Sequence, residues 1–289
     1  MRRRVVVLAL AGLLLGCSSP STPAAGPSSS PSPAPTVSAS ERVEIHTVPP
    51  FPGGARFDYQ IGGPYEPDPA VEVVTRDRRE RPAPGLYNVC YVNAFQTQPE
   101  EAGFWDAQHP DLLVRRGGRL VEDPGWPGER LLDTSTGAKR AALMDVVGPW
   151  IDGCAEAGYQ AVEPDNLDSW TRSRGELTRG GNLAFARLLV ARAHLAGLLV
   201  GQKNTPELGS AGLSDIGFSF AVAEECQVYE ECDAYTDVYG DQVLEVEYTD
   251  TARAAFDEAC RARGDRIAVV LRDRDVVPRG QPGYTDETC

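Results

Sequence analysis

Two short apolar segments of this chain end abruptly in acidic residues. Residues 158–168 read GYQAVEPDNLD, and residues 216–226 read IGFSFAVAEEC. Short buried strands that carry carboxylates at their C-terminal ends are how a β/α barrel builds a polar rim. Two such strands therefore point to acid–base chemistry at one rim.

Similar apolar segments recur along the chain and alternate with helical stretches, as a parallel α/β sheet requires. Residues 42–289 have the usual size of one β/α barrel. We therefore predict a single (β/α)8 TIM-like barrel, although an open doubly wound sheet would also fit the alternation. The expected strands are 57–61, 71–75, 86–94, 160–163, 198–202, 218–222, 243–247 and 267–271, and 131–133 could be another.

Two helices can be placed from capping and breaking residues. Asn182 is expected to cap a helix that stops at Gly197. Gly148 and Pro149 are expected to interrupt or kink the helix that contains them.

The N-terminus has the pattern of a targeting segment. Residues 2–4 are arginines and residues 5–15 form an apolar run, which together predict a signal peptide over residues 1–16. The following Cys17 resembles the lipidated cysteine of a bacterial lipobox; an ordinary secretion signal is the alternative. Residues 17–41 are rich in Ser, Pro and Ala and predict a disordered tether. We thus expect an extracytoplasmic protein whose only contact with the membrane is a lipid anchor.

Six cysteines remain after Cys17, an even number that suits three disulfides in an oxidising compartment. We expect Cys226 to pair with Cys232, Cys260 with Cys289, and Cys90 with Cys154, although fifteen connectivities are open. No CxxC pair is present and no histidine is close to these cysteines, so a zinc site is disfavoured.

The charge of the chain limits its partners. Its formal net charge is −14, and removal of the signal peptide with its three arginines would bring it to −17. Such a protein should be repelled by nucleic acid and by anionic lipid surfaces. The negative charge would attract a polycationic substrate, or it could serve solubility alone.

Polar residues cluster at the ends of the expected strands, and a barrel would bring them to one rim. No GxGxxG, P-loop, HExxH or GxSxG motif accompanies them, so nucleotide, zinc-protease and serine-hydrolase functions are disfavoured. We expect neither a metal nor an organic cofactor. The rim residues are Asp77, Asn93, Glu163, Asp165, Lys203, Asn204, Glu224, Glu225, Glu247, Tyr248, Arg272 and Asp273.

Several segments between Phe57 and Asp275 resemble the endo-α-1,4-polygalactosaminidase family, glycoside hydrolase family 114. They are NVCYVNA, YQAVEPDNLDSW, LLVGQKN, FAVAEECQVYEECD, VEYTD and AVVLRDRD. The resemblance implies a β/α barrel that hydrolyses internal linkages of α-1,4-linked galactosamine polymers. It also implies that Asp165 and Glu224 are the catalytic carboxylates.

The roles of the individual residues stay open at this point. Glu225 is the rival of Glu224, because successive strand residues point to opposite faces. Lys203 could shift the pKa of a neighbouring acid, contact substrate or form a structural ion pair. Glu247 is expected to point inward. The expected substrate-binding residues are Tyr59, Asp77, Asn93, Glu163, Asn166, Asp168, Lys203, Asn204, Glu225, Glu247 and Tyr248.

The chain departs from the family pattern in two places, which leaves the identity of the sugar open. Ala223 stands where an asparagine is expected, and Asn93-Ala94-Phe95 stands where Ser-Ala-Gly is expected. The alternative to an enzyme is a surface lipoprotein that binds a polysaccharide or solute without turnover. We expect a monomer in either case.

Overall fold

The computed structural model describes residues 49–251 and 253–289. The expected signal peptide, Cys17 and the tether lie outside these residues. Contacts divide the chain into residues 1–44 and 45–289, and all the described residues belong to the second unit. In the part of the chain that the structure describes, no helix is long and apolar enough to cross a membrane.

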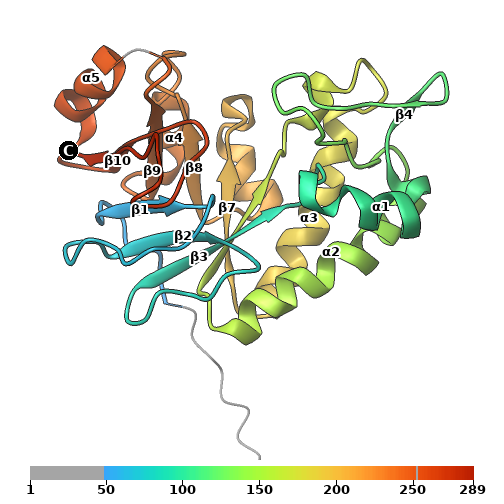
Figure 1. Cartoon of the computed structure of the whole chain (residues 1–289), viewed down its shortest axis with the longest axis horizontal. Helices are drawn as coiled ribbons and strands as arrows, with labels where there is room; N and C mark the ends of the chain where they lie inside the picture. The colour runs from blue at the N-terminus through green and yellow to red at the C-terminus, as the bar shows by residue number, and fades with distance from the viewer. Residues whose placement is uncertain (1–48, 252) are drawn as a thin grey trace, which may run out of the picture. The chain divides into compact units, whose positions relative to one another are not determined.

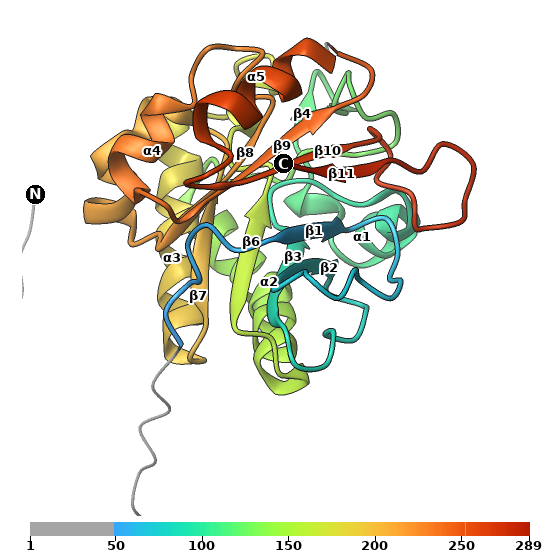
Figure 2. The same ribbon diagram turned by 90° about the vertical axis from the view of Figure 1, so that its left-hand side faces the viewer.

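Eight parallel strands follow one another in chain order around a curved sheet (Figure 1), and a ninth strand, β11, pairs antiparallel with the last of them, β10 (Figure 2). The first parallel strand, β1, lies close to the last, β10 (Figure 2). The sheet therefore nearly closes into a TIM-like barrel, and all eight expected strands are confirmed. The parallel strands are β1 (Phe57–Gln60), β2 (Val73–Asp77), β3 (Tyr87–Asn93), β6 (Ala161–Asp165), β7 (Leu199–Lys203), β8 (Phe220–Glu224), β9 (Val243–Tyr248) and β10 (Ala268–Arg272), and the ninth is β11 (Asp286–Thr288).

Helices cover the outside of the later strands, whereas no helix joins β1 to β2 or β2 to β3. The barrel is thus incomplete in its helical layer. A long connection between β3 and α2, residues 94–136, carries the hairpin β4 (Arg115–Arg116) and β5 (Arg119–Leu120). Residues 131 and 132 form only isolated bridges there and no strand of the barrel. The α-helices are α1 (Ala102–Gln108), α2 (Gly137–Ala157), α3 (Arg179–Leu195), α4 (Asp233–Tyr239) and α5 (Arg253–Arg263), and the shorter helical turns are η1 (Pro99–Glu101), η2 (Pro110–Leu112), η3 (Ser169–Arg172), η4 (Pro206–Leu208) and η5 (Gly212–Ile216).

Alternate residues of each strand point into the barrel, and the rest pack against the helices. Phe57, Val73, Val89 and Phe220 belong to the interior cluster, whereas Cys90 belongs to the outer cluster that faces the helices. Both faces are buried, which explains why the strands read as continuous apolar runs.

The two helix predictions need correction. Thr178 caps α3, because its side chain accepts a hydrogen bond from the Gly181 backbone N–H. Asn182 lies inside the helix and is buried, while Gly197 follows the helix with a left-handed φ of 79°, as expected. The other helix, α2, continues through Pro149 without interruption.

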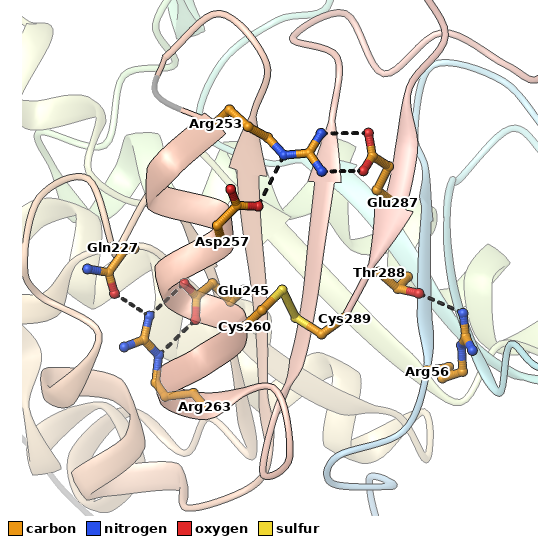
Figure 3. Close-up of a disulfide and its surroundings, with 10 residues drawn as sticks. All are labelled: Arg56, Gln227, Glu245, Arg253, Asp257, Cys260, Arg263, Glu287, Thr288 and Cys289. Carbon is orange, nitrogen blue, oxygen red and sulfur yellow. Dashed lines mark hydrogen bonds and ion pairs between the residues drawn. A yellow bond between two sulfur atoms is a disulfide. The ribbon is translucent and has the colours of Figure 1, made fainter.

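Three disulfides have the expected pairing. Cys90–Cys154 joins β3 to α2, and Cys226–Cys232 closes a short loop after β8. Cys260–Cys289 ties α5 to the end of β11 (Figure 3). In the same region Arg253 on α5 binds Glu287 on β11 through both carboxylate oxygens (Figure 3). The antiparallel strand is therefore held covalently and by ion pairing.

Candidate active site

A cavity of about 530 Å³ lies at the C-terminal ends of the central strands. Asp165 at the end of β6 and Glu224 at the end of β8 both line it. The chain turns sharply at the rim, because the residues that follow β6, β7 and β8 all have a left-handed φ: Asn166 at 66°, Asn204 at 47° and Glu225 at 57°. Asparagine adopts this region more readily than other non-glycine residues, whereas it is uncommon for glutamate, and such residues cluster at functional sites.

Lys203, the last residue of β7, lies between the two acids with only 1% of its side chain exposed. Its Nζ is 3.3 Å from Asp165 Oδ1 and 3.5 Å from Glu224 Oε2. It also donates to Glu163 Oε1 at 2.9 Å and to the Tyr59 hydroxyl at 3.0 Å. Burial acts to lower the pKa of Lys203, but the surrounding carboxylates raise that pKa well above its usual value. One fixed cation thus serves three carboxylates.

Asp165 is held in its ionised form. Its carboxylate accepts a hydrogen bond from the Tyr91 hydroxyl at 2.7 Å and another from the Asn166 backbone N–H at 2.7 Å. Burial alone would raise the pKa of Asp165, but the Lys203 ammonium and these hydrogen bonds bring the pKa below its usual range.

Glu224 has different partners and is slightly more exposed. Its Oε1 accepts from the Tyr248 hydroxyl at 2.5 Å, and its Oε2 accepts from Asn204 Nδ2 at 3.0 Å. Because Asp165 and Glu224 each have an oxygen close to Lys203 Nζ, their nearest oxygens are at most about 7 Å apart. That limit is compatible with the two-carboxylate geometry of glycosidases.

Glu163 lies below the cavity, in the barrel interior. Its Oε1 accepts from Tyr59 at 2.8 Å as well as from Lys203. Its Oε2 is buried and has no hydrogen-bond partner among residues 49–251 and 253–289. Burial raises the pKa of Glu163. This residue therefore positions Lys203 from beneath.

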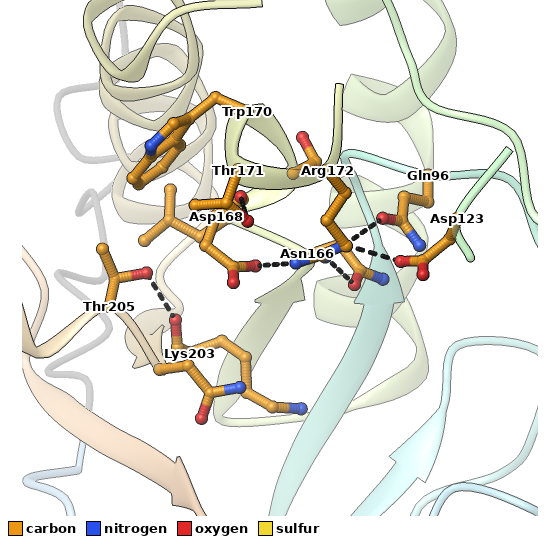
Figure 4. A network of polar contacts seen from close by, with 12 residues as sticks. Gln96, Asp123, Asn166, Asp168, Trp170, Thr171, Arg172, Lys203 and Thr205 are labelled. Atoms are coloured by element: carbon orange, nitrogen blue, oxygen red, sulfur yellow. Dashed lines mark hydrogen bonds and ion pairs between the residues drawn. The ribbon is translucent and has the colours of Figure 1, made fainter. Parts of the chain in front are cut away.

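A second cation, Arg172, binds several polar side chains, among them Asn166, the residue after Asp165 (Figure 4). Arg172 binds Asp123 Oδ2 at 2.6 Å and Asp168 Oδ1 at 2.9 Å. It also donates to Asn166 Oδ1 at 2.7 Å and to Gln96 Oε1 at 3.1 Å. The side chains of Asn166 and Asp168 are therefore fixed by a residue of the short helix η3.

One group of possible metal ligands, formed by Cys226, Cys232 and Glu245, occurs in the described part of the chain. The two cysteines form a disulfide, so they offer no thiolate. Glu245 is bound by Arg263 at 2.8 Å. With these bonds in place, the three residues do not form a metal-binding site.

The sequence model of glycoside-hydrolase family GH114 matches residues 37–289. The chain belongs to this family. It is accordingly a glycosidase, and the acid-lined cavity of this GH114 protein lies where a β/α barrel enzyme carries its active site.

Two solved structures are similar to this GH114 chain. One is Ega3 of Aspergillus fumigatus in complex with galactosamine, with 20% identity and a TM-score of 0.64 over 83% of this chain and 97% of that one. The other is the glycoside hydrolase domain of PelA from Pseudomonas aeruginosa, with 16% identity and a TM-score of 0.54 over 78% of this chain and 97% of that one. At these identities the likeness shows the fold. Comparison with curated protein sequences finds no match.

Most of the residues expected at the site of this GH114 protein come together. Asn93 accepts a hydrogen bond from the cavity residue Asn166, and Lys203 forms ion pairs with Asp165 and Glu224. Tyr59 and Glu163 lie behind Lys203 and hydrogen-bond to it. Those that line the cavity itself are Asp165, Asn166, Asp168, Asn204, Glu224, Glu225 and Tyr248.

Glu225 differs from Glu224 in its partner. Arg274 binds both oxygens of Glu225, at 2.8 and 2.9 Å, and also binds Asp250. The Arg274 guanidinium lies 4.0 Å from the centre of the Tyr248 ring. Glu225 is therefore engaged in holding Arg274 beside Tyr248, while Glu224 points toward Lys203.

Two expected site residues lie elsewhere. The inward position expected for Glu247 is wrong, because this residue shares the outer face of β9 with Glu245 and accepts from the Gln227 backbone N–H at 3.0 Å. Asp77 does not line the cavity either; it accepts from Arg79 at 2.7 Å and from Gln98 at 2.8 Å, and these two residues line the cavity in its place.

Sequence reasoning missed the contribution of the long β3–α2 connection and of the segment after β10. Asp123, Trp126 and Glu129 of the connection line the cavity, as does Arg274. These segments carry no periodic signal, so only a tryptophan between turn-forming Pro and Gly residues could have drawn attention to the connection.

Proposed function

We propose that this protein cleaves internal α-1,4 linkages of a galactosamine-containing polysaccharide, with Asp165 and Glu224 as the catalytic carboxylates. The observation that carries the proposal is their arrangement around Lys203, which points both into one cavity. The fold shared with Ega3, which was solved with galactosamine, supports this class of sugar.

The environments of the two acids suggest their roles. Asp165 is kept ionised by Lys203 and Tyr91 and therefore acts as the nucleophile or as the base that activates water. Glu224, on the more exposed side of the cavity, protonates the oxygen of the leaving sugar. This chemistry requires two carboxylates and water and needs no metal or organic cofactor.

The remaining cavity residues supply hydrogen bonds to the sugar. Asn166 and Asp168 are held by Arg172, Asn204 is held by Glu224, and all three line the cavity. Tyr248 and Asn93 contact the same groups from the sides. The acidic protein as a whole favours a cationic amino-sugar polymer over nucleic acid.

The protein acts outside the cytoplasm in this proposal. Three disulfides in one domain suit an oxidising compartment. A lipid on Cys17 and the tether of residues 17–41 would then hold a monomeric catalytic domain at the membrane surface, within reach of an extracellular polymer.

The test is to incubate the protein with α-1,4-polygalactosamine and with other α-glycans, to count new reducing ends and to identify fragments by mass. We expect oligosaccharides of several lengths from polygalactosamine. Asp165→Asn and Glu224→Gln should each lower the rate roughly 100- to 10,000-fold with folding retained. Asp237→Asn and Glu258→Gln, on exposed positions, remove the same charge and serve as controls. Wild-type rates in both site variants would refute the assignment.

A further inference from the structure

The acids of the cavity differ in whether a basic side chain neutralises them. Asp165 and Glu224 share Lys203, Asp123 and Asp168 share Arg172, and Glu225 binds Arg274. Glu129 has no Lys or Arg partner among residues 49–251 and 253–289, although it is half-buried. The cavity carboxylates Glu100 and Asp275 also have none, but they are solvent-exposed.

The Glu129 carboxylate is nevertheless fixed in place. Its Oε2 accepts from Gln96 Nε2 at 3.0 Å and from Asn93 Nδ2 at 3.2 Å. Its Oε1 has no hydrogen-bond partner among the described residues and is accessible to solvent. Burial and the charge of Asp165 raise the pKa of Glu129 to about 7, although both amides act against that rise. A half-buried carboxylate without a counter-ion is costly, and a cationic ligand would offset that cost.

Glu129 is also connected to the proposed reaction centre. Asn93, which donates to Glu129, accepts a hydrogen bond from Asn166 at 3.0 Å. Asn166 directly follows Asp165 and donates its backbone N–H to that carboxylate. A sugar unit that contacts Glu129 would therefore lie next to the one that contacts Asp165.

An exposed aromatic ring lies on the same turn. Trp126 lines the cavity with 44% of its surface exposed, which is unusual for so large a side chain. Its backbone carbonyl accepts the Glu129 N–H at 3.1 Å, which closes the turn. An indole face provides a flat apolar platform and is the aromatic ring that attracts cations most strongly.

We infer that the turn from Trp126 to Glu129 is a subsite for one unit of the polymer, in which Trp126 stacks on the sugar ring and Glu129 binds a protonated amine. This inference rests on the proposed function and specifies its substrate further. An N-acetylated unit is neutral and larger, and it would leave the Glu129 charge desolvated and unpaired. The subsite therefore selects free amino sugars over acetylated ones.

The test compares Glu129→Gln with wild type on fully deacetylated and on partly N-acetylated α-1,4-polygalactosamine. We expect kcat/KM on the deacetylated polymer to fall roughly 10- to 100-fold, mainly through KM, because a charge-assisted contact is lost. The acetylated polymer should be affected much less. Glu122→Gln, on an exposed residue of the same connection that does not line this cavity, is the matched control.

Trp126→Ala provides a second test, which concerns the contact between the exposed indole ring and the sugar. It should weaken cleavage of both polymers alike, because the ring contacts the sugar face and not the amine. In wild type, KM for the deacetylated polymer should rise as the pH falls through about 7, as Glu129 takes up a proton, and this rise should be absent in Glu129→Gln.

Binding of galactosamine oligomers, measured by calorimetry on the same variants, separates the two proposals. Wild type that binds free-amine oligomers better than acetylated ones without cutting either would refute the hydrolytic assignment and keep the subsite. An unchanged preference in Glu129→Gln, in binding and in cleavage, would overturn the subsite and leave the catalytic assignment standing.

Discussion

At the scale of single residues, Lys203 determines the electrostatics of the site. It is buried and lies within 3.5 Å of carboxyl oxygens of Glu163, Asp165 and Glu224, so its ammonium contacts three carboxyl groups at once. Removing one member of such a buried group leaves uncompensated charge, which costs more than the group contributes as a whole.

We therefore expect Lys203→Met to lower the free energy of unfolding by about 3 kcal/mol or more. Without the ammonium, the pKa of Asp165 rises, so activity that needs ionised Asp165 should be lost at a higher pH as the solution is acidified. Denaturant unfolding and a pH–rate profile measure the two effects. Lys139→Met, which removes a partly exposed lysine of α2, is the control, and an acid limb unmoved by Lys203→Met would contradict the argument.

Tyr248 is the second residue with a definite expected effect. Its hydroxyl donates to Glu224 at 2.5 Å, and Arg274 covers its ring. Tyr248→Phe should lower kcat roughly 10-fold or more, because the hydrogen bond that orients the Glu224 side chain is lost, while the fold is retained. Tyr229→Phe, at a position 65% exposed, should leave kcat unchanged. Equal rates in both variants would exclude a role for this hydroxyl.

At the scale of elements, the start of α3 contains two polar residues with different roles: Thr178 is the helix cap and Asn182 is a buried core residue. Thr178 caps the helix, whereas Asn182 donates to the Leu167 carbonyl and to Ser169 Oγ, both at 2.8 Å, and accepts from Thr134 at 2.5 Å. We expect Thr178→Ala to cost about 1 kcal/mol of unfolding free energy. Asn182→Ala should cost about 2 to 3 kcal/mol, because it leaves buried groups unpaired. Chemical denaturation ranks the two variants, and the reverse order would contradict this account.

Elements were the most predictable part of this protein, because apolar runs such as residues 218–222 and 267–271 bounded by polar residues indicate strands wherever they occur. The direction of individual side chains was less predictable. Glu245 and Glu247 are acids on a strand with both faces buried, so composition does not reveal which face is the interior. The outward position of Glu245 is explained by Arg263 of α5, a partner that only the tertiary packing supplies.

The residues of the β3–α2 connection were missed for a related reason. Trp126 and Glu129 reach the cavity because bridges such as Gln96 to Leu131 and Leu113 to Leu132 fold the connection over the barrel rim. These contacts join residues that follow no repeating pattern, so nothing local in the sequence predicts them.

At the scale of the whole molecule, the three disulfides close loops of different length. Their sequence separations are 64 for Cys90–Cys154, 29 for Cys260–Cys289 and 6 for Cys226–Cys232. Loop-closure entropy predicts that paired Cys→Ala replacements lower the free energy of unfolding by about 4, 3.5 and 2.5 kcal/mol in that order. Thermal and denaturant unfolding of the three double variants would check the order, and a largest loss for the shortest loop would contradict it.

The shared ammonium also governs how kinetics of this enzyme should be interpreted. The proposed reaction needs Asp165 ionised, and the Lys203 ammonium lowers the pKa of this carboxyl, so the acid inflection of a pH–rate curve is a macroscopic constant that depends on both groups. A displaced inflection in a variant therefore does not by itself say which of the two groups has changed. Site-resolved titration by NMR is the measurement that separates them.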